Sequence, residues 1–299
     1  MIKKLVLNTG LVVLVVFILD FAIGRTLRHF YYKETSGFHF RTTYSMEKTD
    51  AEILIFGSSR ANHHYVPEIF EDSLGMTFYN TGRDGNGIFY QQALLKSVLK
   101  RHKPKIIILD YRGEFNKLRT EYDQMSSILP YYRTHNEIRK TIELRGEFEK
   151  IKLLSEIYPF NSQILTIAMG NMEANKNRNP DNKGYVALET AWPPKLETYT
   201  STKEYMVDSN KVNAFRDFVS AARISGASVY VVYSPLYQKI ARNQEAEVCK
   251  QICTEERIQF WDFSRDSYFL SRQNLFYDVN HLNHTGAKIF SSIIADKIN

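Results

Sequence analysis

The sequence predicts an α/β fold in which a parallel sheet is covered by helices on both faces. From residue 51 onward, short apolar segments with strand composition alternate with segments whose apolar residues recur at helical spacing. Continuous apolar runs of this kind are typical of strands buried on both faces of a sheet. Hydrophobic residues make up 43% of the 299 residues and aromatic residues 13%, which is enough for a large core.

Each predicted element follows from a local pattern. The predicted strands are Glu52–Phe56, Met76–Asn80, Lys105–Asp110, Ser228–Tyr233 and Ile258–Phe263. The predicted helices are about Asn62–Leu74, Gly87–Arg101, Val212–Ile224, Gln238–Glu256 and a C-terminal helix that ends near Ile298, for which Asn283 is the expected N-cap. Because ligands bind beyond the carboxyl ends of such strands, we expect a site near Gly57, Gly82 and the residues after Asp110.

The alternation stops between about residues 115 and 210, where the sequence predicts an insertion. Glu137–Ile157 has the composition of a long charged helix, and Asn171–Lys183 is polar and rich in asparagine. Such an insertion is either a helical cap that contributes to specificity or a surface elaboration. We therefore expect an anchor over residues 1–24, a linker over 25–50, and one domain over 51–299 that contains the insertion.

The N-terminus predicts a membrane anchor. Leu5–Ile23 is a nearly continuous apolar run that would span roughly 28 Å as a helix, about the thickness of a bilayer core. Ala22-Ile23-Gly24 resembles a signal-peptidase site, but the run is long for a cleaved signal, so we predict a retained anchor. Basic residues flank the run on both sides; they are Lys3, Lys4, Arg25, Arg28 and Lys33. The leading lysines favour a cytoplasmic N-terminus and a main domain outside the cytoplasm.

The charge and the cysteines exclude some classes of protein. The net charge is +6, but the basic residues are scattered and no arginine-rich arm or zinc-finger spacing is present, so we predict no nucleic-acid partner. A basic surface also suits anionic lipid or an acidic polysaccharide. Cys249 and Cys253 lie four residues apart in a predicted helix, and we interpret them as core residues rather than as a metal or redox pair.

The turn after the first predicted strand carries two serines. Gly57-Ser58-Ser59 ends an apolar run and precedes a helical segment, so a serine here lies beside the free N–H groups of a helix start. Such a serine is either a nucleophile or a simple helix cap. Arg60, which follows directly, either holds an anion or forms a structural ion pair.

The residues ahead of the last predicted helix favour the nucleophile. Asp278 and His281 are three residues apart, so in a tight turn the carboxylate accepts from one imidazole nitrogen and leaves the other free as a general base. Ser59, Asp278 and His281 then form a catalytic triad. Asp278, His281 and His284 also have the spacing of metal ligands, but no further ligands cluster with them, and we predict neither a metal nor a cofactor.

These motifs resemble those of the SGNH (GDSL-like) hydrolase superfamily, in particular its membrane-anchored DltD-like and alginate-acetylation-like branch. Gly57-Ser58-Ser59 corresponds to the first sequence block, Asn80-Thr81-Gly82 to the second, and Asp278-Val279-Asn280-His281 to the fifth. The resemblance covers about residues 51–113 and 212–299. It implies a flavodoxin-like three-layer sandwich with a parallel sheet, Ser59 as the nucleophile, and the N–H groups of Ser59 and Gly82 as the oxyanion hole.

The third block departs from the family pattern Gly-x-Asn-Asp. This chain has Asp110-Tyr111-Arg112-Gly113-Glu114-Phe115-Asn116, without an asparagine at the expected place. Asn116, Asn86 and Arg112 are the alternatives for the missing oxyanion donor. Losing one such donor costs on the order of 100-fold in rate or more, which weakens the case for efficient hydrolysis more than that for acyl transfer in a complex.

The resemblance implies a serine esterase or O-acyltransferase that acts on acyl esters of a cell-envelope glycan through an acyl-enzyme. The expected partners are an acylated glycan or acyl donor and the membrane, and a multi-spanning membrane acyltransferase is a further one to test. The altered third block leaves an alternative from another class. In that reading the chain is a weakly active or inactive SGNH-like scaffold, or a glycan-binding protein, tethered to the membrane.

Overall fold

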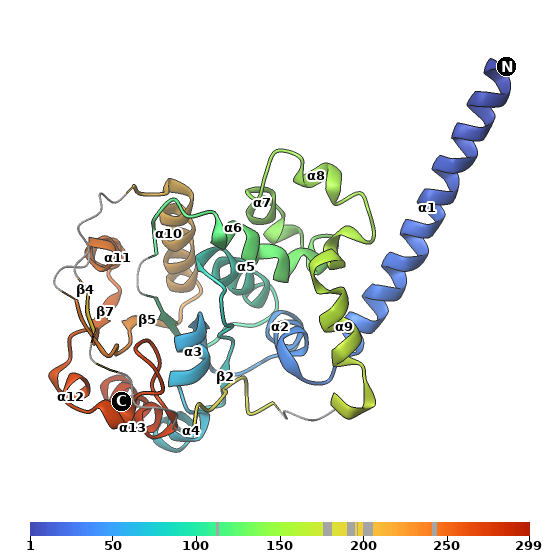
Figure 1. Cartoon of the computed structure of the whole chain (residues 1–299). Coiled ribbons are helices and arrows are strands. Elements are labelled where there is room, and N and C mark those ends of the chain that lie inside the picture. The colour runs from blue at the N-terminus through green and yellow to red at the C-terminus, as the bar shows by residue number, and fades with distance from the viewer. Residues whose placement is uncertain (112–113, 176–180, 190–194, 196, 200–205, 241–243) are drawn as a thin grey trace. The chain divides into compact units, whose positions relative to one another are not determined.

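The computed structural model describes residues 1–111, 114–175, 181–189, 195, 197–199, 206–240 and 244–299 (Figure 1). The chain divides into two compact units. Unit 1 comprises Met1–Thr43 and Met125–Pro180, and unit 2 comprises Tyr44–Gln124 and Asp181–Asn299.

Unit 2 contains the predicted parallel sheet, which confirms the α/β class. Its strands are β1 (Ile53–Gly57), β2 (Phe78–Asn80), β3 (Ile106–Asp110), β5 (Ser228–Tyr233) and β7 (Gln259–Asp262). Their order in the sheet is β2-β1-β3-β5-β7, and every neighbouring pair is parallel. The residues of β1, β2 and β3 are all buried, as their apolar sequences predict.

Helices pack against alternate residues of these strands. Ile53, Ile55 and Ile108 share a core with α3 (Ser59–His64), α4 (Pro67–Leu74) and α13 (His284–Ile298). The side chain of Phe56 points the other way and meets Phe218 of α10 (Ser209–Ile224), with ring centroids 5.3 Å apart. Helix α10 packs in turn on α5 (Ile88–Leu99).

Two predicted helices of unit 2 differ from the structure. The expected helix Asn62–Leu74 is two helices, because Pro67 begins α4 and the residues before it are extended. The expected helix Gln238–Glu256 begins instead with strand β6 (Gln238–Ile240), which pairs with β4 (Glu197–Tyr199); helix α11 follows at Gln244–Glu255. The remaining elements of this unit are α6 (Thr120–Gln124), α12 (Ser267–Leu270) and the 3-10 helix η5 (Gln273–Leu275).

Unit 1 contains the apolar N-terminal helix. Helix α1 spans Ile2–Lys33 and is long and apolar enough to cross a membrane. The region expected as a linker over 25–50 holds the end of α1 and helix α2 (Gly37–Glu47). The C-terminal end of α1 packs against the rest of unit 1. Tyr31 is buried there, and the Tyr31 hydroxyl lies 3.2 Å from the hydroxyl of Tyr131.

The insertion in unit 1 is a series of short helices rather than one long one. The expected helix Glu137–Ile157 is interrupted by turns around Gly146, a residue of low helix propensity. The elements of this region are η1 (Met125–Tyr131), η2 (Asn136–Ile138), α7 (Arg139–Glu143), α8 (Glu149–Lys152), η3 (Tyr158–Gln163), α9 (Ile164–Gly170) and η4 (Glu173–Asn175).

Candidate active site

The site begins where β1 ends, at a turn that requires glycine. Gly57 has φ +145°, and a Cβ there would lie 2.6 Å from the backbone oxygen of Asp110 on the neighbouring strand. Gln91 of α5 holds the turn from the other side. Its Oε1 accepts from the Gly57 N–H at 3.1 Å, and its Nε2 donates to the Gly57 carbonyl at 2.8 Å. The backbone that leads into Ser58 and Ser59 is therefore fixed.

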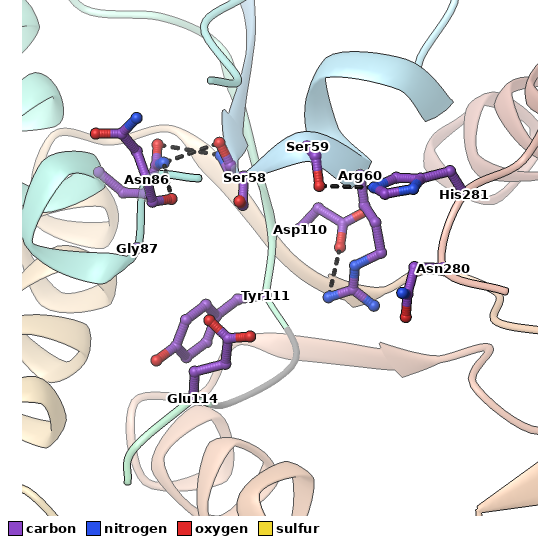
Figure 2. A pocket seen from close by; sticks show the side chains of 12 residues that line it. Ser58, Ser59, Arg60, Asn86, Gly87, Asp110, Tyr111, Glu114, Asn280 and His281 are labelled. Atoms are coloured by element: carbon purple, nitrogen blue, oxygen red, sulfur yellow. Dashed lines mark hydrogen bonds and ion pairs between the residues drawn. The ribbon is translucent and has the colours of Figure 1, made fainter. Parts of the chain in front are cut away.

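Ser59 is the first residue of α3 and faces a cavity of about 210 Å³ within unit 2. The cavity lies at the carboxyl ends of β1 and β3, where the sequence predicts a site. Figure 2 shows the Ser59 hydroxyl pointing at the His281 ring and the Arg60 guanidinium between Asp110 and Asn280. The lining residues are Gly57, Ser58, Ser59, Arg60, Asn86, Gly87, Gln91, Asp110, Tyr111, Glu114, Asn280 and His281.

Ser59, His281 and Asp278 form a continuous chain of hydrogen bonds. His281 Nε2 lies 2.7 Å from Ser59 Oγ, and His281 Nδ1 lies 2.9 Å from each carboxylate oxygen of Asp278. The Asp278 Oδ1 atom also accepts from the N–H groups of Asn280 and His281, at 2.7 and 2.9 Å. The structure thus brings together the three residues of the predicted triad.

The charge of Asp278 sets the tautomer of His281. Partial burial alone raises the pKa of the Asp278 carboxyl, but hydrogen bonds from the His281 ring and from the N–H groups of Asn280 and His281 hold this pKa below its ordinary value. An ionised carboxylate only accepts, so Nδ1 of His281 carries the proton. In a neutral ring Nε2 then accepts from the Ser59 hydroxyl, which is the arrangement of a general base beside a nucleophile.

His64 fixes the backbone next to His281 of the triad. Its Nε2 accepts from the N–H of Leu282 at 2.9 Å, which fixes the residue that follows His281. The His64 side chain is fully buried, and burial lowers the pKa of its imidazole, with smaller contributions from His281, Arg60 and His63. The ring is therefore neutral in the folded protein at neutral pH.

His64 makes the folded state sensitive to acid. Its imidazole has an ordinary pKa of 6.5 in the unfolded chain and a lower pKa in the folded protein. The unfolded chain thus binds the extra proton first, and stability falls as the pH drops below about 6.5, by at most ~1.4 kcal/mol per pH unit. We expect His64→Gln, which retains an acceptor for Leu282, to show a shallower loss. Urea unfolding between pH 7 and 5 measures this; parallel curves would contradict it.

Arg60 brings an incompletely paired cation to the cavity. One guanidinium nitrogen, Nη2, lies 3.5 Å from Asp110 Oδ1, and the group stacks 4.9 Å from the centroid of the Tyr233 ring. The other terminal nitrogen, Nη1, is buried and has no hydrogen-bond partner among the described residues. Burial raises the pKa of the Asp110 carboxyl, and the Arg60 charge opposes this rise. Arg60 is both an ion-pair partner and a donor with one free position.

Two predicted oxyanion donors are placed differently from the expectation. The N–H of Gly82 donates to Oδ1 of Asn80 at 2.9 Å, so it is already engaged. Asn116 bridges to Val207, and its side-chain oxygen accepts from the N–H of Leu118. Neither Gly82 nor Asn116 is among the described residues that line the cavity. The N–H of Ser59, the third predicted donor, lies at the start of α3.

The alternative oxyanion donors, His284 and the two cysteines lie at separate places in the structure. Asn86 lines the cavity, and Arg112 lies outside the described residues. His284 Nδ1 lies 2.8 Å from the hydroxyl of Tyr185, and no metal-binding group of three His, Cys, Asp or Glu side chains occurs in the described ranges. Cys249 and Cys253 are buried in α11, as expected for core residues.

Sequence reasoning missed several residues of the cavity. Gln91 lies in the middle of a predicted helix, where nothing local marks it as a clamp on Gly57. Tyr111 and Glu114 belong to the altered third block, and that departure from the family pattern is a signal that could have identified them. Asn280 lies between Asp278 and His281, so its place at the site follows from theirs.

Comparison of the chain with models of protein families finds no match, and a search of curated proteins finds no similar sequence. The geometry around Ser59 and the motifs of the sequence therefore carry the functional argument.

Proposed function

We propose that this protein is a serine esterase or O-acyltransferase that forms an acyl-enzyme on Ser59. The observation that supports it most directly is the chain of hydrogen bonds from Ser59 through His281 to Asp278, with the Ser59 Oγ to His281 Nε2 distance of 2.7 Å. A serine paired with a neutral imidazole whose far nitrogen is held by a carboxylate is the arrangement that activates a hydroxyl for acyl transfer.

The reaction proceeds in two halves. His281 Nε2 takes the proton from Ser59 Oγ as Oγ attacks the ester carbonyl, and the tetrahedral intermediate collapses when His281 returns that proton to the departing alcohol. Water or a sugar hydroxyl then loses its proton to His281 and attacks the acyl carbon. The proton passes to Ser59 Oγ as the acyl group leaves. The acceptor decides between hydrolysis and transfer.

The SGNH assignment is part of this proposal. Counted along the chain, the strand order of the sheet is 2-1-3-4-5, which is the order of flavodoxin-like sheets. The serine follows the first strand, and the Asp-x-x-His motif precedes the last helix, as in the family that the motifs resemble. A flavodoxin-like SGNH domain accounts for both positions, whereas an unrelated α/β fold requires them to coincide by chance.

The cavity favours a short acyl group. Its volume of about 210 Å³ lies below the ~300–1,000 Å³ of typical ligand pockets. Most of the residues that line it have polar side chains, and Tyr111 is the one large aromatic residue among those described, so no apolar channel for a long chain is evident among them. We propose an acetyl-sized ester of a glycan as the substrate, with the sugar outside the cavity.

The anchor gives this activity a location. We propose that α1 is retained as a single membrane span and that unit 2 acts outside the cytoplasm, on a glycan of the cell envelope. The length and exposed apolar surface of α1 support the span. The two lysines at its N-terminus support the orientation.

A second candidate function follows from the oxyanion hole. Because the Gly82 N–H is engaged by Asn80 and the third block is altered, the site has fewer evident donors for an oxyanion than the family pattern provides. A weakly active or inactive scaffold, or a glycan-binding protein, would fit that feature. An inactive scaffold or a glycan-binding protein would not use the Ser59–His281 pair.

A fluorophosphonate probe followed by peptide mass spectrometry separates the two candidates. We expect the purified full-length chain in detergent to carry the adduct on Ser59, and to cleave p-nitrophenyl acetate faster than p-nitrophenyl octanoate. An adduct on Ser58, or no adduct together with no acetate cleavage, would count against the activated serine. An adduct with equal rates on both esters would retain the enzyme but refute the short-chain pocket.

Arg60 is the donor that we propose for a substrate oxygen in this cavity. Removing a preorganised donor to a developing oxyanion costs about 100–1,000-fold in rate. We therefore expect Arg60→Met to lower kcat/KM for p-nitrophenyl acetate by about 100-fold. Because this variant leaves Asp110 buried without its cation, the double variant Arg60→Met/Asp110→Asn is the better test. Wild-type kinetics in a folded double variant would refute this role.

A further inference from the structure

Unit 1 carries a row of exposed apolar side chains on and beside α8. Phe148, Ile151 and Leu154 are 64%, 63% and 75% exposed. They are spaced by three residues, so in this helical turn they lie along one side. Glu149 and Leu153, four residues apart, are buried and point the other way. The segment therefore has an inner side that is held by the protein and an outer apolar side.

The inner side is fixed by ionic contacts. The carboxylate of Glu149 receives Arg145 Nη1 at 3.1 Å, the Tyr158 hydroxyl at 2.7 Å and Lys152 Nζ at 3.4 Å. A buried carboxylate with three partners holds the orientation of α8 strongly. Phe148 and Ile151 are thus directed outward by a rigid turn rather than left outside by chance.

The row lies next to the position along α1, at Asp20, where the contacts of this helix with the rest of unit 1 end. Asp20 of α1 accepts from Ser155 Oγ at 2.5 Å and from the N–H of Glu156 at 2.7 Å. Gly24 touches the same segment, because a Cβ there would lie 2.3 Å from Cβ of Glu156. Ser155 directly follows Leu154, so the apolar row is at the level of Asp20.

That level is where a bilayer would end. A bilayer core takes about 20 helical residues, and the apolar residues of α1 from Ile2 to Leu19 are all highly exposed. Asp20 then marks the interface between hydrocarbon and headgroups. Lys150 and Lys152 flank Ile151 with side chains 69% and 49% exposed, each near a glutamate, and their charge suits anionic headgroups.

We propose that Phe148, Ile151 and Leu154 insert into the interfacial zone of the bilayer that α1 crosses, so that unit 1 rests on the lipid surface. The inference rests on the proposed membrane anchoring. Exposed apolar side chains beside basic ones at the level of a span are the pattern of an interfacial membrane contact. The contact adds to the packing that already holds α1 in unit 1, and it fixes the orientation of unit 1 at the membrane.

Depth-dependent quenching tests the contact on the full-length chain. Single cysteines at Ile151 and Leu154 are labelled with an environment-sensitive fluorophore, and the protein is reconstituted in phosphatidylcholine vesicles with a minority of phosphatidylglycerol. The two native cysteines are buried, and the unmutated chain gives the labelling background. Ile224 of α10, also 75% exposed, provides the matched control, and Leu11 in α1 reports the span.

We expect lipids brominated near the headgroup to quench the labels at Ile151 and Leu154 but not at Ile224, and deeply brominated lipids to quench the label at Leu11. If the label at Leu11 is quenched but the labels at Ile151 and Leu154 are no more quenched than that at Ile224, the membrane contact is overturned and the anchor is retained. It would leave a membrane protein as the occupant of the row. Equal quenching at all exposed sites would also overturn the contact. Without quenching at Leu11, the anchor and the contact both fail.

Discussion

We expect replacement of Ser59 with alanine to remove the proposed activity: kcat/KM for p-nitrophenyl acetate should fall by about 10⁴-fold or more, and fluorophosphonate labelling should be abolished. In the proposed mechanism this hydroxyl accepts the acyl group, and nothing else that the structure describes lies at the same point against His281 Nε2. Residual rate then reflects binding and whatever donors remain around the oxyanion. Ser59 is half-buried at a helix start, so alanine fits and folding is unaffected.

Ser58 is the matched control for this variant. It is the neighbouring residue, it also lines the cavity, and it does not cap α3 through its side chain. We expect Ser58→Ala to stay within a few-fold of the wild type in the same assay. If Ser58→Ala and Ser59→Ala lose activity equally, the sequence register that identifies Ser59 as the nucleophile is refuted.

The buried ion pair of Lys211 and Glu121, next to Gly87 in the cavity wall, is expected to make a large contribution to stability. Lys211 Nζ lies 2.7 Å from Glu121 Oε1, and the two side chains are 0% and 8% exposed. The other oxygen of Glu121 accepts from the N–H of Ile88 at 3.3 Å, and the carboxylate fills the space where a Cβ of Gly87 would lie. Because Glu121→Ala leaves a buried ammonium unpaired, we expect a loss of about 3–5 kcal/mol in the free energy of unfolding.

Denaturation in mild detergent measures this loss against an exposed pair of the same length. Arg216 and Glu255 are also 2.7 Å apart, but their side chains are 42% and 43% exposed. Glu255→Ala should therefore cost much less free energy of unfolding than Glu121→Ala does. The double variant Lys211→Met/Glu121→Leu removes both charges and should recover most of the stability. Equal losses in Glu121→Ala and Glu255→Ala would mean that burial does not govern the pair.

The fold could be predicted where consecutive residues are apolar, because such a run indicates a buried strand. The five strands of the sheet are short apolar runs, and each was expected within two residues of its bounds. The split at Pro67 shows that one residue can override a good helical pattern. Strand β6 and the packed end of α1 depend on partners far along the chain, such as Tyr131 for Tyr31, and no local pattern reports those contacts.

The candidate site divides in the same way. Asp278 and His281 were predictable as a pair because they lie three residues apart in one turn. The Asp278 carboxylate accepts from the N–H groups of Asn280 and His281, which fixes that turn. The donors around the oxyanion were not predictable. A motif shows which residues are neighbours in sequence. It does not show that the Asn80 side chain accepts from the Gly82 N–H, or that Arg60 Nη1 has no hydrogen-bond partner in the part of the chain that the structure describes.

The separation of Ser59 and His281 along the chain, 222 residues, has a consequence for biosynthesis. During translation Ser59 is made 222 residues before His281. Until then the serine has no base and is an ordinary hydroxyl. A chain that ends before His281 lacks the base that the proposed mechanism gives to Ser59. In the proposed mechanism, a reactive Ser59 therefore reports that the chain has been made and folded at least as far as His281.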